Sequence, residues 1–137
     1  MLLCNIENFF NQFLGRDMIV GIDFDGTISH YDGFKGKGNF GDPIPGSRIF
    51  INKLISAGHI IVIYTTRLEV DQIRKYLLKH DINFHHINFS PDNIERDLHP
   101  AKQCCSIYID DRAINFGGDW EDTFEKILNF KPWWKND

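Results

Sequence analysis

Short apolar runs alternate along this chain with longer segments in which apolar residues recur every three or four positions. Runs with few polar residues are typical of strands buried on both faces of a sheet. They lie at 18–24, 59–65, 84–89 and 104–110. The segments with helical spacing lie at 2–16, 48–58, 68–80 and 119–130. Strands separated by such helices predict right-handed crossovers and a mainly parallel sheet with helices on both faces, a three-layer Rossmann-like α/β fold.

Turn and capping residues mark the ends of several predicted helices. Gly15 and Gly58 follow the first two helical patterns, and Asp119 or Asp122 stands near the start of the last one. With 137 residues, 42% of them hydrophobic, the chain has room for one domain and a core, so we predict a single domain over 1–137. The Gly-rich segment 28–46 is short enough to form only a hairpin or a flap.

Charge and cysteine content narrow the classes of partner. A formal net charge of −4 argues against a broad basic surface, so nucleic acid is a disfavoured partner. No apolar stretch is long enough to cross a bilayer, and the first residues do not resemble a secretory signal. Three cysteines, an odd number, suit a reduced compartment. We therefore expect a cytoplasmic protein with no membrane partner, and we expect Cys104 and Cys105 to be small buried hydrophobic residues.

Polar side chains follow the predicted strands where each strand ends, which is where ligands bind in parallel α/β sheets. The first strand is followed by Asp23, Asp25, Gly26 and Thr27, the second by Thr65, Thr66 and Arg67, and the fourth by Asp110, Asp111 and Arg112, with Lys102 shortly before it. The sequence therefore predicts that carboxylates, hydroxyl groups and an ammonium group converge on one edge of the sheet.

The spacing of the first group has a geometric reason. Side chains two apart in an extended segment point to the same side, so Asp23 and Asp25 can face one substrate. Gly26 lets the backbone turn out of the strand, and Thr27 begins the exit loop. Two carboxylates about 4 Å apart repel by roughly 4 kcal/mol at an effective dielectric of about 20, so a cation is needed. Oxygen ligands of this kind suit Mg²⁺, and Lys102 supplies a second positive charge.

Four segments in this order resemble the haloacid dehalogenase superfamily of phosphatases: DFDGT at 23–27, IVIYTTR at 61–67, Lys102, and YIDDR at 108–112. The resemblance spans roughly residues 18–130. It implies a Mg²⁺-dependent phosphatase that hydrolyses a phosphate monoester through an aspartyl-phosphate. The family's usual cap domain has no room here, so segment 28–46 stands in its place.

The resemblance also implies a role for each matching residue. Asp23 matches the nucleophile, and Asp25 matches the acid and base that serves the leaving oxygen and then water. Thr65 matches the hydroxyl that holds a phosphate oxygen, with Thr66 as the alternative. Lys102 matches the ammonium that steadies nucleophile and phosphate; Lys75 and Lys79 are less well placed. The metal ligands are Asp23, the backbone carbonyl of Asp25, and Asp111 with or without Asp110. Gly26, Thr27, Thr66 and Arg67 are expected to contact the substrate. For Arg67 and Arg112, structural ion pairing is an equal alternative to orienting phosphate or carboxylates.

Several alternatives stay open. An open site without a cap favours either a macromolecular phosphate or a small phosphorylated metabolite enclosed by another subunit, which leaves room for a homo-oligomer. The Asp-Asp-Arg sequence also resembles the phosphatase part of polynucleotide kinase-phosphatases, so a nucleic-acid 3′-phosphatase is the second hypothesis. A non-catalytic phosphate-binding protein is the third. A phospho-accepting receiver domain is disfavoured, because Asn88 and Ser90 stand where it would carry its phosphorylated aspartate. For Trp133 and Trp134 we favour packing over a subunit contact.

Overall fold

The structure, a computed structural model, describes residues 17–136. The helix predicted at 2–16 lies outside the described residues. Four strands form one sheet: β1 (Ile19–Asp23), β2 (Ile60–Tyr64), β3 (His86–Ile87) and β4 (Ile107–Ile109). Their order is β3-β2-β1-β4 and every neighbouring pair is parallel, which confirms the predicted parallel α/β sheet. All four carboxyl ends therefore lie at the same edge.

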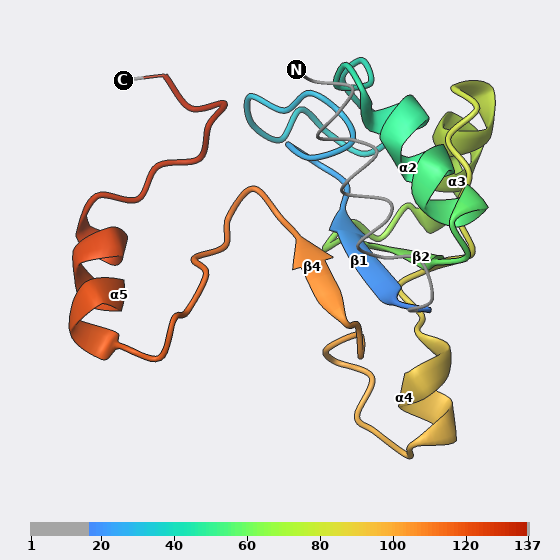
Figure 1. Ribbon diagram of the computed structural model, residues 1–137. Helices are drawn as coiled ribbons and strands as arrows, with labels where there is room; N and C mark the ends of the chain where they lie inside the picture. Colours follow the sequence, from blue (N-terminus) through green and yellow to red (C-terminus); the bar gives the residue numbers. More distant parts are fainter. Residues whose placement is uncertain (1–16, 137) are drawn as a thin grey trace, which may run out of the picture.

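Two helices cover one face of this sheet and provide most of the core. α2 (Ser47–Ser56) buries Ile51, and α3 (Val70–Lys79) buries Ile73 and Leu77. These side chains share one cluster with strand residues of β1 and β2, among them Val20, Ile22, Ile61 and Ile63. Figure 1 shows α2 and α3 together on one side of the sheet and α4 (Pro91–Glu95) on the other.

The short helix α4 was not predicted from the sequence, where the residues after Pro91 were expected to form a polar connection. Proline suits the first turn of a helix, because the N–H groups of that turn have no carbonyl partner within the helix and the missing N–H of proline costs no hydrogen bond. The backbone of Asn93 bonds to Ser90, and the Asn93 side chain donates to the carbonyls of His99 and Lys102. This turn thus organises the crossover from β3 to β4.

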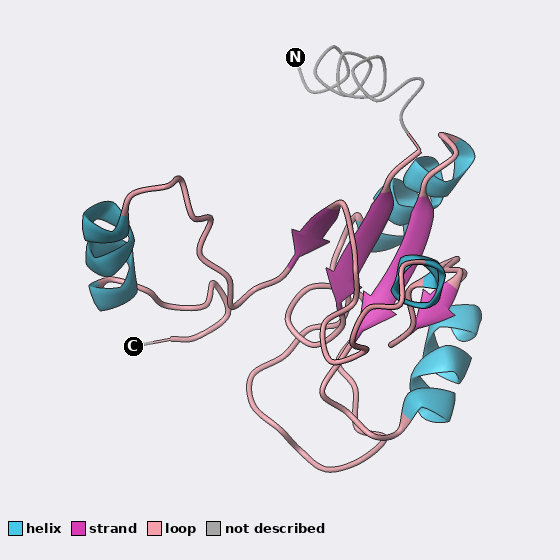
Figure 2. Ribbon diagram, turned by 90° about the horizontal axis from the view of Figure 1, so that it is seen from below, coloured by secondary structure: helices cyan, strands magenta, loops and turns pink. Residues whose placement is uncertain are grey.

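The carboxy-terminal part departs from the expected burial. The predicted fourth strand is present as β4, but all three of its residues are exposed, whereas helices were expected on both faces of the sheet. Cys104 and Cys105, expected to be buried, are half-buried free thiols. β4 is an edge strand with no described helix over it. α5 (Trp120–Leu128) begins at Asp119, whose carboxylate accepts from the N–H groups of Glu121 and Asp122. Figures 1 and 2 show α5 standing away from the sheet.

Segment 28–46 forms a hairpin-like flap. The N–H of Ile44 donates to the carbonyl of Ile28 (2.7 Å), and the N–H of His30 donates to that of Asp42 (2.8 Å). Tyr76 of α3 donates its hydroxyl to the carbonyl of Gly41 (2.8 Å), which fastens the flap to the body. Among residues 17–136, no helix has the length and apolar character needed to cross a membrane.

Candidate active site

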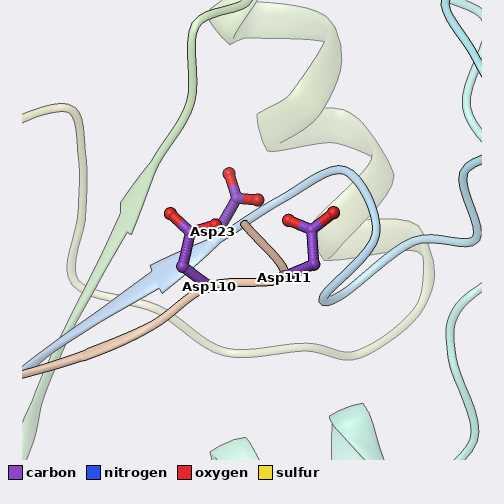
Figure 3. A group of neighbouring side chains, drawn as sticks. All are labelled: Asp23, Asp110 and Asp111. Atoms are coloured by element: carbon purple, nitrogen blue, oxygen red, sulfur yellow. The ribbon is translucent and has the colours of Figure 1, made fainter. Parts of the chain in front are cut away.

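Three carboxylates meet at the carboxyl edge of the sheet. Asp23 is the last residue of β1, and Asp110 and Asp111 directly follow β4, its hydrogen-bonded neighbour. One oxygen from each lies within 4.8 Å of the others. Figure 3 shows that the three side chains project to the same side of the strands. This spacing is compatible with a single shared cation.

The carboxylate of Asp111 is only partly satisfied by hydrogen bonds. Its Oδ2 accepts from Trp134 Nε1 at 2.5 Å. Its Oδ1 is buried and has no fixed hydrogen-bond donor among the described residues, so that only a proton shared with Asp23 could serve it in place of a cation. A buried anionic oxygen without a partner costs free energy, so this atom needs a cation or a shared proton. The oxygen-only donor set and the unsatisfied atom both fit Mg²⁺.

Asp23 ionises with difficulty in the metal-free protein. Burial, a hydrogen bond with Asp111 and the charges of Asp110 and Asp111 raise its pKa from 3.8 to about 8. The pKa of Asp111 is lowered although burial opposes this, because hydrogen bonds with Asp23 and Trp134 stabilise its anion. The proton on this pair therefore resides on Asp23. A bound cation would replace that proton.

Asp110 is held by groups from two elements. Tyr64, at the end of β2, donates its hydroxyl to Asp110 Oδ2 (2.8 Å), and the N–H of Arg112 donates to Oδ1 (2.8 Å). Burial and the contact with Asp110 raise the pKa of Tyr64, so this phenol remains a donor. Each carboxylate oxygen still has a free lone pair for a cation. Tyr64 was not singled out from the sequence, although it directly precedes Thr65.

Asp25 does not join the three carboxylates through its side chain, which turns to Arg67. The two contacts are Nε to Oδ2 at 2.6 Å and Nη2 to Oδ1 at 2.9 Å, a bidentate pair. Arg67 also donates to Glu69 (2.8 Å), and its guanidinium lies 5.2 Å from the centre of the Phe34 ring and 4.9 Å from that of Phe40. Only 5% of its side chain is exposed. Arg67 thus holds Asp25 rather than standing free for a substrate, which is the ion-pairing alternative of the two roles expected for it.

Thr65 is fixed by a residue that the sequence analysis gave no role in the site. Asn88 follows β3 in a left-handed conformation (φ 52°). Its Oδ1 accepts from the N–H of Thr65 (2.8 Å), and its Nδ2 donates to the carbonyl of Thr65 (3.1 Å). The Thr65 hydroxyl accepts from the N–H of Arg67 (3.1 Å). Its proton remains free to donate to a ligand.

The site opens into a pocket of about 1400 Å³. Four predicted catalytic residues line it: Asp23, Asp25, Thr65 and Lys102; so do Thr66 and Asp110. The ammonium of Lys102 lies 5.1 Å from the centre of the Tyr108 ring. Arg67 lines a separate pocket of about 340 Å³ beneath the flap, together with Asp25 and Lys35. Lys35 pairs with Asp32 there, at 2.9 Å.

Gly26 and Thr27 do not line the larger pocket. Gly26 has φ 78°, and a side chain on it would collide with Asp111 Oδ2 and lie 2.8 Å from Trp134 Nε1. The Thr27 hydroxyl is buried without a hydrogen-bond partner in the described structure. Gly26 therefore provides close packing behind Asp111, and the predicted substrate contacts of both residues have no support in this arrangement.

The carboxy-terminal tail reaches the site from far along the sequence. Trp133 Nε1 donates to the carbonyl of Gly26 (2.8 Å), while Trp134 bonds to Asp111. The guanidinium of Arg112 lies over the rings of Trp134 and Tyr31, at 5.4 and 5.8 Å. Packing was the favoured prediction for the two tryptophans, and their polar role was missed. The only sequence signal for it was the pair of indole N–H donors.

Comparison with known proteins supports the fold alone. No protein-family model and no curated protein matches the chain. A solved structure, that of a conserved protein from Bacteroides thetaiotaomicron, superimposes with a TM-score of 0.61 at 22% sequence identity. The match covers 83% of this chain and 92% of that one. It agrees with the Rossmann-like α/β architecture and assigns no chemistry.

Proposed function

We propose that this protein is a Mg²⁺-dependent phosphatase that transfers the phosphoryl group of a small phosphorylated metabolite to Asp23 and then to water. The observation that carries the proposal is the buried Oδ1 of Asp111 in the cluster with Asp23 and Asp110. It has no fixed donor among the described residues, so only a shared proton or a cation can satisfy it. These clustered carboxylates lie at the ligand-binding edge of a parallel sheet and need a cation to compensate their charge. This favours a bound metal ion that assists the reaction of an anionic substrate.

The residues that would hold the ion are Asp23, Asp110 and Asp111, with the predicted carbonyl of Asp25. When bound, Mg²⁺ would neutralise charge on the carboxylates and on the substrate phosphate. The chain itself supplies the rest of the site. Thr65 offers a hydroxyl proton to a phosphate oxygen, and Lys102 lines the same pocket as the only lysine among its lining residues.

In the proposed reaction, an oxygen of Asp23 forms a bond to phosphorus as the bond to the ester oxygen breaks. The departing oxygen takes a proton from Asp25. Water then attacks the aspartyl-phosphate, the bond to Asp23 breaks, and Asp25 accepts the proton of that water. Asp25 must loosen at least one of its two bonds to Arg67 for these transfers. We expect substrate binding near the flap to cause this loosening of the bonds between Asp25 and Arg67.

The test is phosphate release from an aryl phosphate with and without Mg²⁺. We expect activity only with the ion, loss on adding a chelator, and a fall of at least about a thousandfold in Asp23→Asn. Asp71→Asn, an exposed change on α3, is the matched control and should keep full activity. Undiminished turnover by a folded Asp23→Asn protein would rule out Asp23 as the nucleophile.

The substrate class can be found with a screen of sugar phosphates, nucleotides and 3′-phosphorylated oligonucleotides. We expect the small metabolites to be preferred, since the net charge of −4 disfavours a nucleic-acid backbone. Selective hydrolysis of the oligonucleotides would instead establish the 3′-phosphatase hypothesis.

One observation favours a second candidate, a phosphate-binding protein without turnover. Both oxygens of Asp25 are bound by Arg67, so the residue that should move protons is engaged. This candidate predicts Mg²⁺-dependent binding of inorganic phosphate by calorimetry and no phosphate release from any ester in the screen. Turnover with a single ester would exclude it.

A further inference from the structure

The helix α5 presents an apolar face that the rest of residues 17–136 leaves uncovered. Trp120 is 72% exposed and Phe124 is 57% exposed. Ile127 and Leu128 continue the same face one turn later and are also exposed; Thr123 is the helix's one buried residue. A helix of nine residues is marginally stable in water unless such a face packs against something. The helix therefore requires a packing partner.

The strand β4 carries a second uncovered apolar surface. Ile107 pairs with Val20 and Ile109 with Ile22, and paired residues on parallel strands point to the same face. Val20 and Ile22 are buried in the core beneath α2 and α3, whereas Ile107 and Ile109 are 44% and 41% exposed. The layer of helices thus stops short of β4.

The chain itself keeps these two surfaces apart. Residues 112–134, here called the arm, leave the sheet after Asp111 and return to it, because Trp134 donates to Asp111 and Trp133 donates to the carbonyl of Gly26. Arg112 packs on the Trp134 ring at the same point. The two ends of the arm are therefore pinned together, and α5 projects from the far end, clear of β4 in both ribbon views (Figures 1 and 2).

We propose that two copies of this chain form a two-fold symmetric dimer in which α5 of each copy packs over β4 of the other. Each copy has an uncovered helix, α5, and an uncovered strand, β4, so two copies can satisfy both surfaces in one two-fold symmetric dimer. Each contact would bury on the order of 700 Å², because it covers two aromatic side chains, at about 150–250 Å² each when fully buried, together with the exposed aliphatic side chains of α5 and β4. Two contacts would bury about 1,400 Å², within the range of about 1,200–2,000 Å² for stable complexes.

The dimer would also complete the pocket. The wall of the larger pocket includes Ile107 and Tyr108 of β4 and the first residues of the arm, 112–115. A partner helix over β4 would lie along this wall and narrow the opening. This inference is independent of the reaction proposed above, since it depends only on the two exposed faces and the pinned arm.

The first test is the mass of the full chain in solution, measured by light scattering and sedimentation equilibrium. We expect a dimer, and we expect the double variant Trp120→Ser/Phe124→Ser to raise its dissociation constant by at least about a hundredfold. Leu68→Ser, at a residue 81% exposed outside both surfaces, is the control and should leave the dimer intact. Circular dichroism checks that each variant folds. A monomeric wild-type chain would overturn the proposal.

The second test distinguishes α5 over β4 from other dimers. Ile107→Lys should be monomeric on its own, as should the α5 double variant. Mixing them should give a heterodimer with one intact contact, in which α5 of the Ile107→Lys chain meets β4 of the double variant, and it should dissociate more readily than the wild-type dimer. A mixture that associates no more than either variant alone at concentrations well above the wild-type dissociation constant, or an Ile107→Lys protein that stays dimeric, would overturn the arrangement. Phe9 and Phe13 belong to the apolar spacing of the helix predicted at 2–16. Loss of the dimer in Phe9→Ser/Phe13→Ser, while the α5 double variant keeps it, would also overturn the arrangement.

Discussion

Burial and two neighbouring carboxylates give Asp23 a pKa of about 8 in the metal-free protein, well above its ordinary value of 3.8. The folded chain therefore holds a proton on Asp23 between these pH values, whereas the unfolded chain has released it. Stability must then fall as pH rises through this window, because the folded state binds the extra proton. Ionisation of Asp23, the proposed nucleophile, thus lowers the free energy of unfolding when no cation is bound.

Asp23→Asn should remove this pH dependence. We expect the variant to equal the wild type near pH 4 and to exceed it by about 2 kcal/mol at pH 8 without metal, less than the full shift because solvent screens a half-buried side chain. Urea unfolding at several pH values with a chelator present measures the difference. Asp71→Asn should follow the wild-type profile throughout, and an Asp23→Asn profile as steep as the wild type would refute the explanation.

Arg67 illustrates a different residue-scale effect, a buried cation with two acidic partners. Arg67→Met would leave Asp25 and Glu69 without their counterion in a site where the Arg67 side chain is 5% exposed. We expect a loss of about 3 kcal/mol of unfolding free energy at pH 7. Arg74→Met on α3, where the side chain is exposed, should change stability by less than about 0.5 kcal/mol. Equal stabilities from denaturant titration of the two variants would contradict the role.

Among the elements, the carboxy-terminal tail matters most to the proposed metal site. Trp134→Phe keeps a ring beneath Arg112 and removes the donor to Asp111 Oδ2. Groups that orient a metal ligand typically contribute tenfold or more, so we expect Mg²⁺ affinity to fall by about tenfold. Calorimetric titration of Mg²⁺ measures this without relying on turnover.

A matched control for this change is Trp120→Phe on α5, which also removes an indole N–H but lies away from the carboxylates. It should bind Mg²⁺ as the wild type does. If Trp134→Phe binds the ion equally well, the tail does not orient Asp111.

The elements themselves were largely predictable from the sequence, with instructive exceptions. β1, β2, α2 and α3 form where apolar spacing placed them, because their burial pattern is set by the period of each element. The exposure of β4 was not predictable, since the run CCSIYID looks as apolar as a buried strand; its exposure depends on where the next helix goes. The position of that helix is decided by tertiary packing, which the apolar pattern of the strand does not contain.

At the scale of the whole molecule, the parallel topology is the reason that the candidate site could be predicted from the sequence. Asp23, Asp110 and Asp111 gather because the ends of parallel neighbours share an edge, so position along each strand was sufficient. The hydrogen-bond partners of the aspartates at this edge could not be predicted from the sequence. The bond from Arg67 to Asp25 and the bond from Trp134 to Asp111 depend on side-chain directions beyond the strand ends, which no periodicity encodes.

The return of the tail has a consequence for how the molecule assembles. The bond from Trp133 to Gly26 joins residues 107 apart in sequence. This contact closes a loop that contains β2, β3 and β4, and the chain loses the freedom of that loop before it gains the contact. The parallel sheet can exist before the tail arrives, but the arrangement around Asp111 cannot. Ion binding would therefore report that the last part of the fold has closed, after most of the secondary structure is already present.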